Sequence, residues 1–149
     1  LAAVADVRLA DEAYAKGNFA EALAGYEKAQ AILKSGPLAT RAKLGHALAQ
    51  VQAGKRNDAV SELMQIFNDP TQFKAARDEA GYQLASLAAD AGNSSEVQKD
   101  VEQLMQIDPS SPWTQRAMML RSTLPMPAPV AAPAKTGSGP SVEVKIPGK

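Results

Sequence analysis

The side chains that could carry out chemistry are few in this sequence and lie far apart along it. His46 is the only histidine, and it stands in a helical stretch between Gly45 and Ala47. Catalysis would need a nucleophile or an orienting carboxylate beside that imidazole, and the sequence identifies neither. The other candidates for proton transfer are two carboxylate pairs, Asp11-Glu12 and Asp78-Glu79. Because neighbours on a helix point about 100° apart, we expect both pairs, and His46, to be ordinary helix surface.

Metal, thiol and phosphate chemistry have even less support. There is no cysteine, which excludes disulfides, thiolate nucleophiles and cysteine-ligated metals. No cluster of histidine and acidic residues has the spacing of a metal site. Gly36-Pro37 and Gly137-Ser138-Gly139 lack the Gly-Lys-Ser/Thr ending of a phosphate loop. The sequence therefore predicts no cofactor, no metal and no catalysis. An enzyme is the third functional class, and a catalytic pocket with a bound cofactor would favour it.

Composition indicates a helical protein whose core is built from small aliphatic side chains. The 16 basic residues balance the 16 acidic ones, which disfavours a nucleic-acid binder because such proteins carry a basic excess. Aromatic residues make up only 5 % of the chain, whereas 29 of its 149 residues are alanine, the strongest helix former. No apolar run reaches the roughly 18 residues of a membrane span. Apolar stripes at helical spacing, such as Leu44, Leu48 and Val51, predict helices across most of residues 1–124.

Prolines divide the chain into two parts. Six of the ten prolines and three of the ten glycines lie in residues 125–149, a density that excludes a helix there. We expect an extended linker in this part, followed by a flexible stretch at residues 136–139. The last nine residues alternate apolar and polar side chains as a strand does, with Val142, Val144 and Ile146 on one side. That strand is either disordered or added to the sheet edge of a partner.

Glycines reveal a repeat in residues 1–124. Gly17, Gly54 and Gly92 each follow a predicted helix and precede a short polar turn, and they are 37 and 38 residues apart. A period of this length with two helices per unit is typical of an α-solenoid. Each glycine is expected to end its helix in the left-handed conformation. Five positions after each glycine stands a small residue that lets two antiparallel helices cross closely. These residues are Ala22, Ala59 and Val97.

The repeat resembles the tetratricopeptide repeat family. The second unit departs from the family pattern at Arg56, where an aromatic residue is usual. The matching positions are Leu9-Ala10, Tyr14, Gly17-Asn18-Phe19, Glu21-Ala22, Tyr26 and Ala29 in the first unit, Ala47, Gly54 and Ala59 in the second, and Leu84-Ala85, Gly92-Asn93, Leu104 and Asp108-Pro109 in the third. The resemblance implies an all-α domain over residues 1–124, with hairpins at about 3–37, 38–71 and 72–109 and a capping helix at 111–124. Residues 125–149 form the separate tail.

The capping helix is predicted to begin with Ser111 as its cap and Pro112 in its first turn. Such a helix covers the exposed end of the last repeat, as solenoids require for solubility. We expect Trp113 to pack on that repeat together with the apolar side chains of the helix, rather than to bind a ligand. We expect its polar side chains to face water. These are Gln115, Arg116 and Arg121.

In the tetratricopeptide family the first helix of each unit lines a concave groove. The resemblance places there a mixture of apolar, aromatic and charged side chains, which suits a helix or an extended segment as ligand. They are Arg8, Asp11, Tyr14, Arg41, Leu44, Leu48, Tyr82, Gln83 and Ser86. Packing against the neighbouring unit is an equal alternative for Leu44 and Leu48. Some members clamp the C-terminal carboxylate of chaperones with lysine, asparagine and arginine. Here the clamp positions hold none of these, which disfavours that activity. They are Val7, Asp11, Gly45, Glu79 and Gln83.

These observations favour a non-catalytic scaffold that mediates protein–protein interactions within an assembly. The repeat also resembles the soluble part of bacterial envelope proteins of the same family, which implies a periplasmic location and an N-terminal membrane anchor. Because the chain starts at Leu1 rather than at a methionine, we expect a targeting segment or anchor to precede it. A cytoplasmic location is the alternative. The alternative function is a structural subunit whose tail docks on a partner or on a second copy as an added strand.

Overall fold

The computed structural model describes residues 1–126, and all regular structure in this part of the chain is helical. The helices are α1 (Ala2–Ala15), α2 (Phe19–Ile32), α3 (Pro37–Gln52), α4 (Arg56–Asn68), α5 (Lys74–Asp90), α6 (Ser94–Ile107) and α7 (Pro112–Ser122). The all-α prediction is confirmed for these residues. None of the seven helices is both long and apolar enough to cross a bilayer. The expected strand with Val142, Val144 and Ile146 lies outside the described residues.

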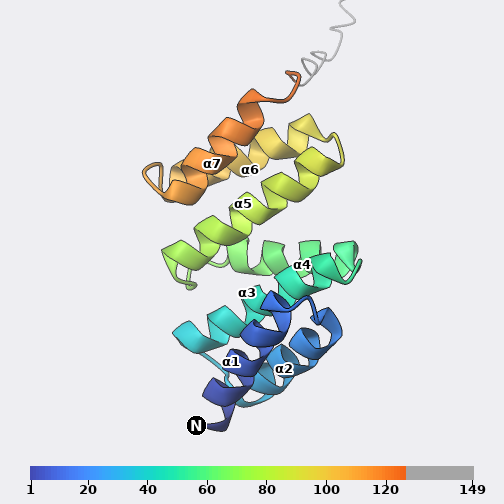
Figure 1. Ribbon diagram of the computed structural model, residues 1–149. Helices are drawn as coiled ribbons and strands as arrows, with labels where there is room; N and C mark the ends of the chain where they lie inside the picture. Colours follow the sequence, from blue (N-terminus) through green and yellow to red (C-terminus); the bar gives the residue numbers. More distant parts are fainter. Residues whose placement is uncertain (127–149) are drawn as a thin grey trace, which may run out of the picture.

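The helices form an elongated stack that runs from α1 at one end to α7 at the other (Figure 1). Every helix packs on the next one in sequence, and further contacts join α1 to α3, α3 to α5 and α5 to α7. Within residues 1–126 the backbones of α2, α4 and α6 do not approach one another closely, although Gln103 of α6 donates a hydrogen bond to Asn68 of α4 at 2.8 Å. The odd-numbered helices therefore form a continuous layer, whereas each even-numbered helix is separated from the next by an odd-numbered one.

Three turns of the stack are built in the same way. Gly17, Gly54 and Gly92 have φ angles of 79°, 79° and 71°, the left-handed conformation that glycine adopts without strain. In each turn the amide after the glycine donates to the carbonyl five residues before it, and this bond closes the first helix. The bonds run from Asn18 to Ala13, from Lys55 to Gln50 and from Asn93 to Ala88, at 2.8, 2.8 and 2.9 Å. The predicted role of these glycines is confirmed.

Buried side chains form two clusters along the stack. The first lies between α1, α2 and α3 and consists mainly of alanines around Tyr26, and the second extends from α3 to α7 around Phe67. The small residues expected where helices cross, Ala22, Ala59 and Val97, are all completely buried. Alanine allows close helix approach, so this core needs few aromatic rings.

Each of the two large buried rings, Tyr26 and Phe67, packs against a glycine on the next helix. Tyr26 of α2 lies over Gly45 of α3, where an added Cβ would come within 2.5 Å of the ring carbon Cζ. Phe67 of α4 lies over Gly81 of α5 with the same crowding. Ordinary contacts between carbon atoms are about 3.5–4.0 Å, so the two rings can be buried only because these positions carry no side chain.

Helix α7 covers the far end of the stack by packing on both α5 and α6. The hydroxyl of Ser111 accepts a hydrogen bond from the amide two residues later at 3.2 Å, and Pro112 occupies the first turn, as predicted. Ala117 is buried in the second cluster. Of the side chains expected to face water, Gln115 and Arg116 are exposed, whereas Arg121 is half-buried and donates to Gln98 at 3.5 Å.

Candidate functional site

Charged side chains from three odd-numbered helices meet on one face of the stack. Arg41 of α3 pairs with Asp11 of α1, and its Nη2 lies 3.0 Å from Oδ1. Glu79 of α5 also faces Arg41: burial raises the pKa of Glu79, and the positive charge of Arg41 partly opposes that rise. Because α3 packs between α1 and α5, these groups form a row of alternating charge across three helices.

A buried tyrosine holds Asp11 in this row. Tyr26 donates its hydroxyl to Asp11 Oδ1 at 2.5 Å, the same oxygen that accepts from Arg41. Burial raises the pKa of Tyr26, and the hydrogen bond to Asp11 raises it further. The hydroxyl therefore remains a donor at neutral pH. With two donors on one oxygen, Asp11 is a fixed hydrogen-bond acceptor and part of the structure of this face.

Apolar side chains lie beside the charged row. Tyr14 and Leu48 line a small cavity of about 70 Å³ together with Asp11 and Arg41. Tyr14 also packs edge-on against Phe19, with ring centroids 5.4 Å apart. Both Tyr14 and Leu48 are half-buried, so they offer a partner apolar surface without moving.

The face continues onto α5 and α7 through an aromatic contact. Tyr82 of α5 packs on Trp113 of α7 with ring centroids 5.4 Å apart. The guanidinium of Arg116 lies over the indole, 4.8 Å from its centroid, a geometry that favours the cation. Trp113 packs as predicted, yet it is half-buried and adjoins Tyr82. It therefore extends the candidate surface, which sequence reasoning did not predict.

We call this surface the odd-helix face, and define it by Asp11, Tyr14, Arg41, Leu48, Glu79, Tyr82 and Trp113. Five of the nine residues that the resemblance places in a groove belong to it. Arg8 is exposed on α1, and Gln83 and Ser86 are half-buried on α5. Within residues 1–126 none of these three joins the contacts above. Clamp positions Val7 and Gly45 are buried.

The burial of Leu44 contradicts one prediction for this face. Its side chain is only 4 % exposed and belongs to the second buried cluster. The assignment of Leu44 to a ligand groove is therefore wrong, and its alternative, packing against neighbouring helices, is correct. The physical reason is that α3 is packed by α1, α2, α4 and α5, so most of its surface is covered. Leu48, one turn later, packs against the same cluster but stays half-exposed.

Two carboxylates that the sequence did not reveal lie beside the imidazole of His46. Its Nδ1 lies 2.7 Å from Glu62 Oε2 on α4, and its Nε2 lies 3.4 Å from Glu27 Oε1 on α2. The hydrogen bond to Glu62 raises the pKa of His46, burial opposes that rise, and the charges of both glutamates add to it. His46 thus links three helices as an ion-paired group. Its partners are 16 and 19 residues away in sequence, so only folding brings them together.

The carboxylate pairs also depart from the expectation of simple helix surface. Asp78 is only 2 % exposed, and burial raises its pKa while a hydrogen bond from Ser111 opposes the rise. Its neighbour Glu79 belongs to the odd-helix face. In the other pair Asp11 is fixed by two donors, and only Glu12 is plain exposed surface. The expectation is therefore wrong for Asp78, which the start of α7 covers.

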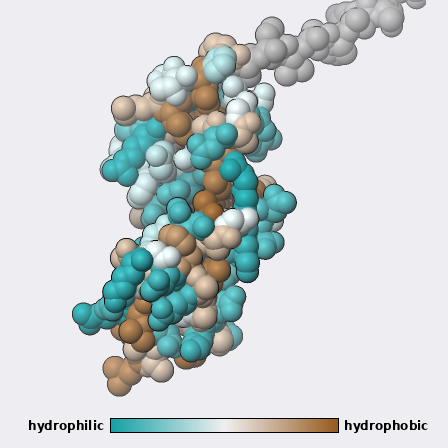
Figure 2. Space-filling view, turned by 45° about the vertical axis from the view of Figure 1, so that its right-hand side comes forward, coloured by the Kyte–Doolittle hydropathy of each residue, from teal (hydrophilic) through white to brown (hydrophobic). Residues whose placement is uncertain are grey.

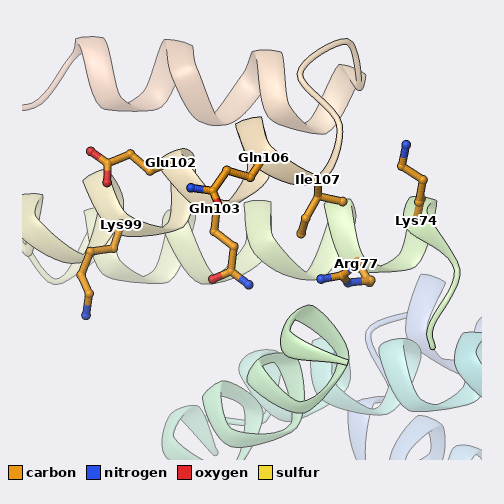
Figure 3. Close-up of a pocket in the computed structure, with 7 residues that line it drawn as sticks. All are labelled: Lys74, Arg77, Lys99, Glu102, Gln103, Gln106 and Ile107. Atoms are coloured by element: carbon orange, nitrogen blue, oxygen red, sulfur yellow. The ribbon is translucent and has the colours of Figure 1, made fainter. Parts of the chain in front are cut away.

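A broad depression of about 720 Å³ over α5 and α6 is lined largely by polar residues (Figure 3). Its cations are already engaged. Lys74 lies 3.8 Å from Asp108, Lys99 lies 3.3 Å from Glu96, and Arg77 donates to the carbonyl of Phe67 at 3.1 Å. In Figure 3 the three side chains point in different directions. The depression therefore does not converge on an anion.

Among residues 1–126 no three histidine or acidic side chains are grouped so as to hold a metal ion. Comparisons with protein-family models, with curated proteins and with solved structures find no match. The likeness to the tetratricopeptide family accordingly depends on the matching residues and spacing in this chain alone.

Proposed function

We propose that this protein is a non-catalytic, tetratricopeptide-like helical-repeat scaffold that binds a segment of a partner protein along the odd-helix face. One observation carries the proposal. Side chains from four successive odd-numbered helices adjoin one another across this face, from Asp11 through Arg41 and Glu79 to the contact between Tyr82 and Trp113. A continuous surface of this kind suits an elongated ligand better than a small molecule.

The chemistry of the face indicates what the segment carries. Tyr14, Leu48, Tyr82 and Trp113 are half-buried, so a partner gains by covering them with apolar side chains. The ion pair of Arg41 and Asp11 is partly exposed and offers both charges to polar groups at one end. The few residues that dominate the binding energy of protein interfaces are enriched in tryptophan, tyrosine and arginine. We therefore place the energetic centre at Tyr82 and Trp113.

A site-directed crosslinking experiment tests this function. A photoreactive amino acid replaces Ser86, which follows Tyr82 by one turn on α5, in the full-length protein expressed in its native organism. The matched control places the same amino acid at Lys28, an exposed position on α2 away from the face. The proposal requires a defined product at position 86 that Tyr82→Ala removes, and no such product at position 28. Equal crosslinking at both positions, or a product that Tyr82→Ala leaves intact, contradicts it.

The same assay separates the face from the tail as the binding element. Removal of residues 127–149 should leave the product at position 86 unchanged, because the face lies entirely within residues 1–126. Loss of the product on truncation would favour the alternative of a structural subunit that docks through its tail.

Following the family resemblance, we place the scaffold on the periplasmic side of a bacterial envelope. Labelling of intact cells with a membrane-impermeant reagent distinguishes this location from the cytoplasm.

A further inference from the structure

A second cavity lies away from the odd-helix face, between α4, α5 and α6. Its volume is about 300 Å³, at the lower end of the range typical of ligand pockets. It lies where α4 and α6 both pack on α5. Gln103 of α6 donates to Asn68 of α4 at 2.8 Å and so joins these two helices beside the cavity. The space-filling view shows brown, apolar surface flanked by teal, hydrophilic surface near the middle of the molecule (Figure 2). The apolar lining comes from all three helices and includes Val60, Met64, Phe67, Leu84, Leu87 and Ala88.

An acidic side chain lines the same cavity. Asp100 of α6 is only 7 % exposed, and its Oδ2 has no hydrogen-bond partner. An unpartnered buried polar group costs roughly 1–3 kcal/mol of stability. Burial, together with the negative charge of Glu96 and against the opposing charge of Lys99, raises the pKa of Asp100 to about 7. This carboxyl therefore weakens the fold, and packing supplies no reason for its presence.

The other charged groups of the cavity are already engaged. Arg56 of α4 donates to the carbonyl of Leu87, and Lys99 lies 3.3 Å from Glu96. The contribution of α5 to the lining is entirely apolar. Asp100 is thus the group whose charge lacks a counterpart, in a cavity whose remaining lining combines apolar side chains with the uncharged polar Asn68, Asn93 and Gln103.

We propose that the cavity between α4, α5 and α6 binds a small organic cation, an ammonium group carried on an apolar body, with the ammonium at Asp100. The apolar body fills the space between Val60, Phe67 and Leu84, and the ammonium pairs with the carboxylate of Asp100, which lines the cavity. The site uses a different side of α5 from the odd-helix face, so it stands independently of the proposed function. A bound cation would also recover the stability that Asp100 costs.

The test uses 2-phenylethylammonium as probe and amide chemical shifts of the full-length protein as readout. Shifts should concentrate at the cavity lining, for example at Ala88, Asn93 and Gln103. Since Asp100 is largely protonated at pH 6 and largely charged at pH 8, the probe should bind roughly tenfold more tightly at pH 8. The uncharged analogue 2-phenylethanol should lack this gain.

Two variants and a matched control complete the test. Asp100→Asn should weaken binding of the ammonium at pH 8 at least tenfold and abolish its pH dependence, while the fold is retained. Ala91→Phe, at an exposed lining position, should block both probes. Asp78→Asn, which changes the other buried carboxyl with an unpartnered oxygen, should leave binding unchanged. Shifts elsewhere, equal losses in both aspartate variants, or pH-independent binding would overturn the proposal.

Discussion

Tyr26 and Phe67 perform the same packing task in two regions of the stack, yet their surroundings differ. Each ring projects from an even-numbered helix onto a glycine of the next odd-numbered helix. The hydroxyl of Tyr26 then reaches Asp11, which Arg41 also binds, so polar groups around that ring have partners. Phe67 has no hydroxyl and lines the cavity in which Asp100 has an unpartnered oxygen.

Titratable groups also divide into those with partners and those without. His46, at the junction of α2, α3 and α4, has a carboxylate near each ring nitrogen, whereas Asp100 has only burial and a like charge acting to raise its pKa. The first arrangement stabilises the fold, and the second opposes it. Residues that lower stability without a packing reason are where function is expected. The comparison therefore separates structural polar groups near Tyr26 from a candidate binding site near Phe67.

The largest loss of stability is expected when a side chain is added at Gly45 or Gly81. We expect Gly45→Ala and Gly81→Ala each to lower the free energy of unfolding by about 2–3 kcal/mol, because a Cβ would overlap the ring above it. Urea denaturation measures the loss. Phe67→Leu should restore part of the stability in the Gly81→Ala background, since the smaller side chain can move. Tyr26→Phe should give no such rescue of Gly45→Ala, because the ring remains.

Asp100→Asn should stabilise the protein by about 2 kcal/mol at pH 8, since it removes a charge that the fold leaves unpaired. The pKa of Asp100 is higher in the folded chain, about 7, than the ordinary 3.8, so its contribution to stability falls as pH rises through this interval. The gain in the variant should therefore be smaller at pH 4 than at pH 8. A variant that is less stable at pH 8 would show Asp100 to be structural.

For His46 we expect the side chain to stabilise the fold, and we expect its removal to cost stability. Its folded pKa is raised above 6.5, so its stabilising contribution is complete below that pH and is lost as pH rises through the folded value. His46→Gln should cost about 1.5 kcal/mol at pH 5.5 and less at pH 8.5 in thermal or urea unfolding. Glu62→Gln should reproduce most of the loss, and Glu27→Gln less, because Glu27 is exposed. A loss that does not vary with pH would remove the ion pair from the explanation.

The smallest losses of stability are expected for variants of the two residues that bind Asp11. Tyr26→Phe should lower stability by about 1 kcal/mol, because it deletes one hydrogen bond and leaves the ring in place. Arg41→Ala should cost less, about 0.5 kcal/mol, since the ion pair with Asp11 is partly exposed. Differential scanning calorimetry in low and high salt checks both, and only the second variant should lose its effect in high salt.

Much of the local structure follows from short-range patterns. The three glycine turns were predictable because a left-handed residue after a helix is a local requirement, and each lies where the spacing indicates. The small residues at the crossings and the cap at Ser111 follow from equally local rules. The side chains of the odd-helix face were predictable only in part. Leu44 and Leu48 occupy similar positions in the pattern, and only the way neighbouring helices pack on each side of α3 decides that Leu44 is buried and Leu48 half-exposed.

The sequence by itself determined that most of residues 1–124 are helical, where helices end, and that small residues stand where helices cross. These features depend on backbone conformation and residue size within a few positions. The tertiary structure alone decided which polar groups have partners. His46 acquires Glu27 and Glu62 from helices on either side of α3, Asp78 is covered by the start of α7, and Asp100 is buried without a counterion. Burial and charge pairing depend on distances between residues far apart in sequence, and the free energy of a buried charge is set by those distances.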